Sequence, residues 1–109
     1  MRIHLKGRGG ATADDELLSR MEKKLEKVAR QVSPRAELTV ELREERNEHV
    51  ADAALRLKGV TLRASERADD IGHAINLVAD DLARQVKRHR DKRRARREAH
   101  KAASQQHAA

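Results

Sequence analysis

The spacing of apolar residues changes in a fixed order along this chain, and that order limits the folds open to it. Ile3 and Leu5 alternate with polar residues, which is the two-residue repeat of a half-buried strand. Apolar residues then recur at intervals of three and four, as in a helix that buries one face. They are Leu17, Leu18, Met21, Leu25, Val28 and Val32. Thr12 is predicted to cap this helix, and Pro34 to end it.

Three stretches of strict alternation follow the first helix. They cover residues 38–43, 51–58 and 60–65, and each has one apolar face. Gly59 separates the last two, and residues 44–48 form a polar turn between the first two. The pattern predicts a three-stranded antiparallel meander with tight connections.

A second helical stripe begins after Asp69 and Asp70, acids that suit the first turn of a helix. Its apolar positions are Ile71, Ala74, Ile75, Val78, Leu82 and Val86. The order β-α-β-β-β-α predicts a single α+β domain over residues 1–95: a four-stranded sheet with two helices packed on one face and water on the other. The first strand should lie parallel to a neighbour through a right-handed crossover. Residues 96–109, basic and then low in complexity, are predicted to form a disordered tail.

The composition limits the kinds of core and of chemical site that the chain can form. The chain has no Phe, Tyr or Trp, so its core must be aliphatic. It has no Cys, which excludes a disulfide framework, a thiolate zinc site and a cysteine nucleophile. The opening residues lack the apolar run of an export signal, and no later stretch approaches the roughly 18 apolar residues of a membrane span. These features predict a cytoplasmic protein with no membrane partner.

Positive charge is concentrated near the end of the chain. Lys and Arg number 25 against 18 Asp and Glu, a net charge of +7. Residues 84–101 hold ten Lys or Arg against Asp91 and Glu98, which gives this segment +8 and leaves −1 for the rest. The second helix should project past the domain as a cationic arm, because the residues after Val86 are good helix formers. Such an arm attracts a polyanion.

Three interpretations of the arm compete. It could be a solvated basic end with no partner. A membrane-surface helix needs an apolar face, and between residues 87 and 101 the only apolar residues are two alanines. Nucleic acid is the favoured polyanion. Without aromatic rings to stack on bases, recognition must go through phosphates and shape, with strong salt dependence.

Several segments together resemble the short-form ribosome hibernation promoting factors, also called ribosome-associated inhibitors, a sigma-54 modulation protein-like family. They are MRIHLKGR, MEKKLEKV, ELTVEL and LRASERADDIGHAINLVADDLARQVKRHRDK, in the family's order over residues 1–95. The resemblance implies a fold like that of double-stranded-RNA-binding domains. Where the family commonly has an aromatic residue after the acidic pair, this chain has Gly72 after Ile71.

The resemblance also implies a function. The protein would bind small-subunit rRNA over the decoding region, block messenger and transfer RNA, and hold ribosomes inactive under stress. Family positions that face RNA match Arg84, Lys87, Arg88, Arg90 and Lys92 on the second helix and Lys23, Lys24 and Lys27 on the first. His89 and Arg93 lie among these cations as further phosphate donors.

Other functions remain as alternatives or are excluded. A basic adaptor, or a general duplex nucleic-acid binder without ribosome specificity, is the competing hypothesis. The segment GRGG lacks the Lys-Ser/Thr of a phosphate loop, and the acidic pairs are typical of helix starts and surfaces. No catalytic constellation, metal site, cofactor or small-molecule substrate is predicted, and we expect a monomer away from the ribosome.

Overall fold

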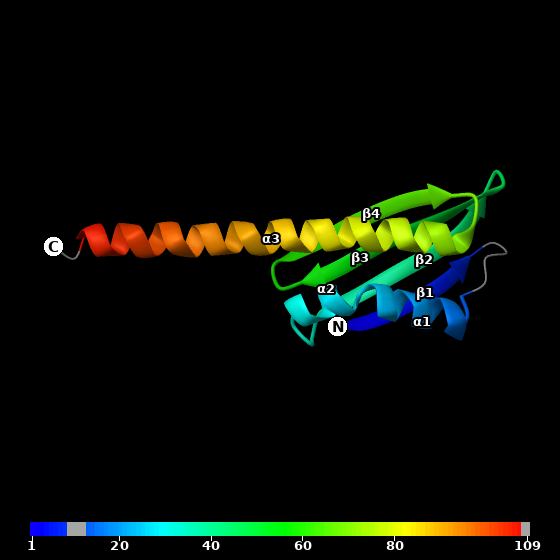
Figure 1. Cartoon of the computed structure of the whole chain (residues 1–109), viewed down its shortest axis with the longest axis horizontal. Helices are drawn as coiled ribbons and strands as arrows, with labels where there is room; N and C mark the ends of the chain where they lie inside the picture. Colours follow the sequence, from blue (N-terminus) through cyan, green and yellow to red (C-terminus); the bar gives the residue numbers. More distant parts are fainter. Residues whose placement is uncertain (9–12, 108–109) are drawn as a thin grey trace.

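The computed structural model describes residues 1–8 and 13–107, which form one sheet covered on one face by helices (Figure 1). The elements follow in the order β1 (Arg2–Arg8), α1 (Asp15–Lys24), α2 (Glu26–Gln31), β2 (Glu37–Glu45), β3 (Glu48–Leu57), β4 (Val60–Ala68) and α3 (Ile71–His107). The predicted α+β class and element order are confirmed, with the first helix divided in two.

The sheet has the strand order β1-β2-β3-β4. β1 lies parallel to β2, with Ile3 opposite Leu38, as the crossover through a helix requires. β2, β3 and β4 pair antiparallel, and Val40, Ala53 and Ala64 share one row of the apolar face. The predicted meander and the parallel first strand are confirmed.

The first hairpin turn is tighter than the sequence predicts, and the second is one residue longer than the predicted single Gly59. β2 runs to Glu45 and β3 starts at Glu48, so only Arg46 and Asn47 form the turn, both at positive φ (52° and 66°). Two successive residues with positive φ twist in the sense of the strands they join. The second turn holds Lys58 and Gly59 (φ 81°).

The start and the middle of the first helical segment differ from the prediction. Asp14 is the N-cap, because its carboxylate accepts a 2.9 Å hydrogen bond from the Leu17 amide. Thr12, predicted as the cap, lies outside the described residues. The helix is interrupted at Leu25 (φ −99°, ψ 10°), although its amide still bonds Met21 and its carbonyl still accepts from Ala29. The interruption is a local kink, and it leaves Leu25 1% exposed in the core.

The core lies between the sheet and the helices and is entirely aliphatic, as predicted. Its largest side chains are less than 2% exposed: Met21, Leu25, Leu38, Leu42, Leu55, Ile75, Leu82, Val40, Val50 and Val78. All of these except Val50 belong to one cluster, to which α1, α2, β2, β3 and α3 contribute. Val50 lies on the opposite face of the sheet, in register with Arg43 and Arg67.

Gly72 permits a close approach at the start of α3. A Cβ at this position would overlap the Arg20 guanidinium and lie 3.3 Å from Asp70 Oδ1. The arginine of α1 therefore takes the space where the family pattern has a larger side chain. This contact helps to set α3 beside α1.

The last helix is longer than predicted. α3 is continuous to His107, whereas residues 96–109 were predicted to be disordered. Ala, Arg, Glu, Lys and Gln in this stretch all have good helix propensity, and no Pro or Gly interrupts it before residue 107. The division of the chain at residue 95 stays a prediction.

Candidate nucleic-acid interface

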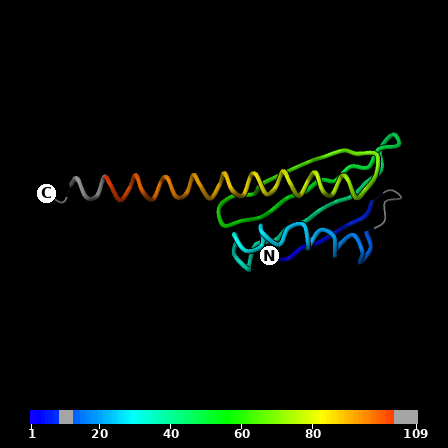
Figure 2. The backbone as a smooth tube through the Cα atoms, in the orientation of Figure 1, coloured from blue at the N-terminus to red at the C-terminus, as the bar shows by residue number. Residues whose placement is uncertain are grey.

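α3 has a packed half and a projecting half. Ile75, Val78, Leu82 and Val86 are at most 2% exposed against β3 and β4. After His89, which is half-buried, every described side chain from Arg90 to Ala102 is exposed. At about 1.5 Å per residue, the 21 residues after Val86 add about 30 Å of free helix. They account for much of the molecule's 65 Å length (Figure 2).

The projecting half keeps its positive charges unneutralised. The ion pairs found among residues 1–8 and 13–102 include none of the ten Lys and Arg between residues 84 and 101. At about 100° per residue these cations are distributed all round the helix axis. Asp80, four residues before Arg84, pairs with Lys24 instead. The end of α3 therefore presents a dense group of cations on a projecting helix, without acidic partners among the described residues.

Lys23, Lys24 and Lys27 lie on the helical layer beside α3. Lys24 Nζ is 3.5 Å from Asp80 Oδ1, so this pair links α1 to α3. α1–α2 and α3 run in the same direction on the same face of the sheet (Figure 1). About one turn after Lys24 and about two turns after Asp80, exposed Lys27 and Lys87 extend the cationic surface. The structure therefore places the two predicted groups on one side of the molecule, with the charge of Lys24 already partnered.

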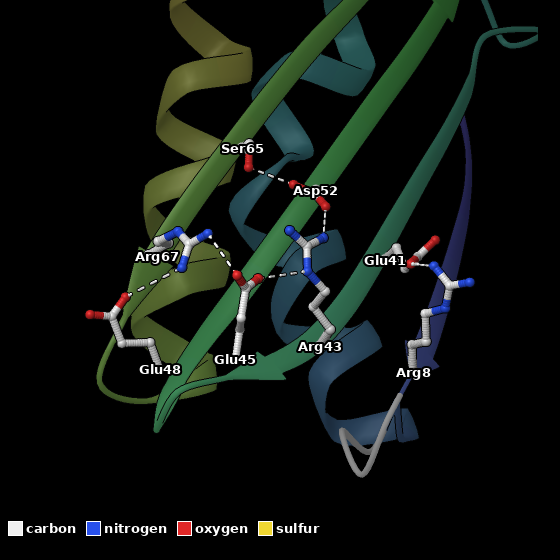
Figure 3. A network of polar contacts seen from close by, with 8 residues as sticks. All are labelled: Arg8, Glu41, Arg43, Glu45, Glu48, Asp52, Ser65 and Arg67. Carbon is white, nitrogen blue, oxygen red and sulfur yellow. Dashed lines mark hydrogen bonds and ion pairs between the residues drawn. The ribbon is translucent and has the colours of Figure 1, made fainter.

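The open face of the sheet also carries arginines, and three of them have acidic partners (Figure 3). Arg43 bonds Asp52 and, at 3.3 Å, Glu45. Arg67 contacts the same Glu45 at 3.4 Å and Glu48 at 3.9 Å. At the edge of the sheet, Arg8 pairs with Glu41 at 3.1 Å.

These contacts shift ionisation in the direction expected for stable pairs. The hydrogen bond from Arg43, with the charge of Arg67, holds the pKa of the Glu45 carboxyl below its ordinary value. Burial acts most strongly on Asp52 and opposes its ionisation, but hydrogen bonds from Ser65 and Arg43 outweigh burial and lower its pKa. Val50 is fully buried on this face, in the same row as Arg43 and Arg67. Three arginines of the open face are thus neutralised by acids, whereas Arg2, Lys6 and Arg63 on the same face are in none of the ion pairs found among residues 1–8 and 13–102.

The sequence did not predict a groove of about 800 Å³ where α3 leaves the domain. One wall is α3 from Val86 to Arg97, and the other is formed by residues 31–37 and 56–58. Its cationic members include Arg35, Arg56 and Lys58, which are far apart in sequence. The signal in the sequence is indirect: the β3–β4 turn and the start of β2 must lie at the end of the sheet beneath the projecting helix.

The described residues also bear on a metal site and on a membrane span. They bring together no group of three or more His, Cys, Asp or Glu side chains that could hold a metal ion. No described helix combines the length and the apolar character needed to cross a bilayer.

Comparisons with known proteins agree on one kind of relative. The family model described as sigma 54 modulation protein / S30EA ribosomal protein matches residues 3–94. A ribosome hibernation promoting factor of Salmonella typhimurium is 42% identical over 53 residues, 49% of this chain and 56% of that protein. One from Acinetobacter guillouiae is 45% identical over 42 residues, 38% of this chain and 37% of that protein. The matched stretches thus span about half or less of these relatives.

Solved structures share the fold. The N-terminal domain of Protein Y from Thermus thermophilus aligns with a TM-score of 0.72 and 30% identity, covering 81% of this chain and 98% of that domain. A ribosomal subunit interface protein from Coxiella burnetii aligns with a TM-score of 0.70 over 84% of this chain and 99% of its own. At 22% identity the Coxiella protein supports the fold alone.

Proposed function

The chain belongs to the sigma 54 modulation protein / S30EA ribosomal protein family, and from this premise we propose that it is a ribosome hibernation factor. In this proposal it binds small-subunit rRNA at the decoding region and blocks messenger and transfer RNA. It acts by occupying the site, without catalysis, in the cytoplasm. It reaches the ribosome as a monomer.

The observation that carries the proposal is the uncompensated charge on α3. Its projecting half holds cations without acidic partners among the described residues, on a helix that stands clear of the domain. A phosphate backbone neutralises such cations and releases counterions, which supplies affinity without reading base sequence. The lack of aromatic side chains agrees with backbone recognition, because there are no rings on which bases could stack.

The proposed rRNA-binding set has a main part and a flanking part. The main part is Arg84, Lys87, Arg88, His89, Arg90, Lys92 and Arg93 on α3. Lys23, Lys24 and Lys27 flank it on the helical layer. Since Lys24 already pairs with Asp80, its contribution to RNA binding should be smaller than that of Lys23 or Lys27.

Co-sedimentation with purified small ribosomal subunits tests the proposal. We expect near-stoichiometric retention in moderate salt, and loss of retention in Lys87→Glu/Arg88→Glu. A matched control is Lys6→Glu/Arg46→Glu, which makes the same change of charge on exposed residues of β1 and of the β2–β3 turn. The control should be retained like the wild type.

The competing hypothesis is a basic adaptor or general duplex binder, and competition distinguishes it. Excess duplex DNA or a long RNA duplex should displace little protein from small subunits if the site is ribosomal. Equal competition by these duplexes would contradict the proposal. Blocking is tested separately: on small subunits, bound protein should reduce the binding of transfer RNA, and the Lys87→Glu/Arg88→Glu variant should not.

A further inference from the structure

The groove beneath the projecting half of α3 differs from the convex helix surface in shape. It encloses about 800 Å³ between two walls that are separate in sequence. Such a volume suits a small or extended ligand, because sites of about 300–1,000 Å³ enclose single small molecules. A space of this size holds a short segment of a single chain, so we consider a single narrow ligand chain.

Both walls of the groove are cationic. Arg35, Arg56 and Lys58 line the side formed by the domain. Arg90, Arg94 and Arg97 line the side formed by the helix, together with Arg93. None of these is in the ion pairs found among residues 1–8 and 13–102, and Glu37 is the one carboxylate in the lining.

The spacing of the helix cations suits a repeating anion. Arg90, Arg94 and Arg97 follow at intervals of four and three residues, about 4.5–6 Å apart along the axis. Their guanidinium groups are planar forks that match phosphate oxygens in pairs. On the domain wall, half-buried Val32 and Leu57 offer aliphatic contact to the parts of a nucleotide that carry no charge.

We propose that this groove binds a short single-stranded segment of RNA by its phosphodiester backbone. An extended acidic peptide fits less well, because the groove meets strand ends and a turn at Glu37 and Leu57. A peptide would find there no free strand edge with which to form a ladder of hydrogen bonds. The inference rests on the proposed function only for the origin of the RNA strand, because that function brings the chain to RNA. The binding chemistry of the groove is argued from its own residues.

Fluorescence anisotropy of the full chain with a labelled oligouridylate tests the groove. The test variant Arg35→Glu/Arg56→Glu changes exposed residues outside the proposed rRNA-binding set. Loss of two phosphate contacts should weaken oligouridylate binding about tenfold or more. Binding of a blunt RNA duplex with the same number of phosphates, and retention on small subunits, should change much less.

The control Lys6→Glu/Arg46→Glu makes the same change of charge away from the groove and should leave oligouridylate affinity near the wild-type value. A milder pair, Arg56→Gln/Lys58→Gln, gives the same direction of effect if the reversed pair folds poorly by circular dichroism. If the test and control variants lost the same affinity for oligouridylate, the groove would not be the binding site. A diffuse positive field would then account for the binding. Displacement of the RNA by oligoglutamate at equal charge concentration would overturn the proposal in favour of a peptide site.

Failure of the groove and failure of the proposed function give different results. If the groove variants bind oligouridylate as tightly as the wild type while small subunits still retain the wild type, the proposed groove site is wrong and the proposed ribosomal function is supported. If small subunits retain no protein while the groove variants lose oligouridylate, the single-strand site stands alone.

Discussion

The open face of the sheet and the projecting half of α3 are both rich in arginine, but three sheet arginines pair with acids, whereas no described arginine of the projecting half does. On the sheet, Arg43 and Arg67 share Glu45 and each has a further acid within reach. On α3 the near neighbours of Arg93 at intervals of three and four are His89, Arg90, Arg96 and Arg97. Neighbouring strands bring acids to the first group, while the helix brings more cations to the second.

Paired and unpaired arginines should contribute to different properties of the protein, the first to stability and the second to RNA binding. A paired arginine supports the fold modestly and has little attraction left for RNA. An unpaired arginine on a projecting helix adds little to stability and attracts phosphate strongly. Substitutions in the two regions should therefore change different measurements.

The largest expected effect is on the salt dependence of small-subunit binding. Lys87→Ala/Arg88→Ala removes two proposed phosphate contacts, so the slope of log K against log salt should become less steep by about 2. Affinity near physiological salt should fall about 10- to 100-fold, which corresponds to about 0.7–1.4 kcal/mol for each lost contact. Filter binding or sedimentation over a salt series measures both quantities.

The matched control for this experiment is Arg43→Ala/Arg67→Ala on the sheet. It should leave the slope unchanged and lower the urea midpoint. If both double variants reduced the slope equally, the contrast between paired and unpaired arginines would be wrong.

A smaller effect is expected from loosening the projecting helix. Ala95→Gly should cost about 1 kcal/mol of local helix stability and weaken ribosome binding about fivefold, because the cations lose their fixed arrangement. Hydrogen exchange should show faster exchange after residue 90, with the urea midpoint unchanged. In Ala83→Gly, an exposed position in the packed half, the midpoint itself should fall. Equal loss of global stability in both variants would show that the end of α3 is part of the folded unit.

The smallest effect concerns the sheet network and depends on pH. Asp52→Asn removes the charge opposite Arg43, and because the pair is partly exposed the cost should be below about 1 kcal/mol. The folded pKa of Asp52 is below its ordinary value, so its contribution is complete above that value and is lost as pH falls through the folded pKa.

Urea unfolding of the wild type and of Asp52→Asn therefore should differ most at pH 5 and above. The two curves should converge as the pH falls below the ordinary value of 3.8. A difference that grows in acid would contradict the assigned pairing. RNA binding of Asp52→Asn should stay within twofold of the wild type, or rise slightly as Arg43 is released.

Local periodicity was enough to predict most of the fold. Alternation at Leu38, Val40 and Leu42 and the stripe from Ile71 to Val86 depend on near neighbours, and both were predicted correctly. The kink at Leu25 was missed, since no Gly or Pro marks it, and the turn predicted over residues 44–48 consists only of Arg46 and Asn47.

The candidate site was predictable only in part, because partnership between charges is a matter of tertiary geometry. Asp80 and Arg84 have the four-residue spacing of an ion pair within one helix. Asp80 instead pairs with Lys24 across the interface between α3 and α1. Arg35, Arg56 and Lys58 are far from α3 in sequence, yet they line the groove beneath it. The disordered tail was predicted from its low complexity and from the absence of a face to bury, although the same residues have good helix propensity.

Directed cleavage of rRNA tests the central claim most directly. The chain has no Cys, so Ala95→Cys on α3 and His4→Cys on the open sheet face can each carry a single iron chelate that cuts nearby RNA. With small subunits bound, the account predicts strong cleavage around the decoding region from position 95 and weak cleavage from position 4. Stronger cleavage from position 4 would show that the open face of the sheet, and not the end of α3, faces the RNA.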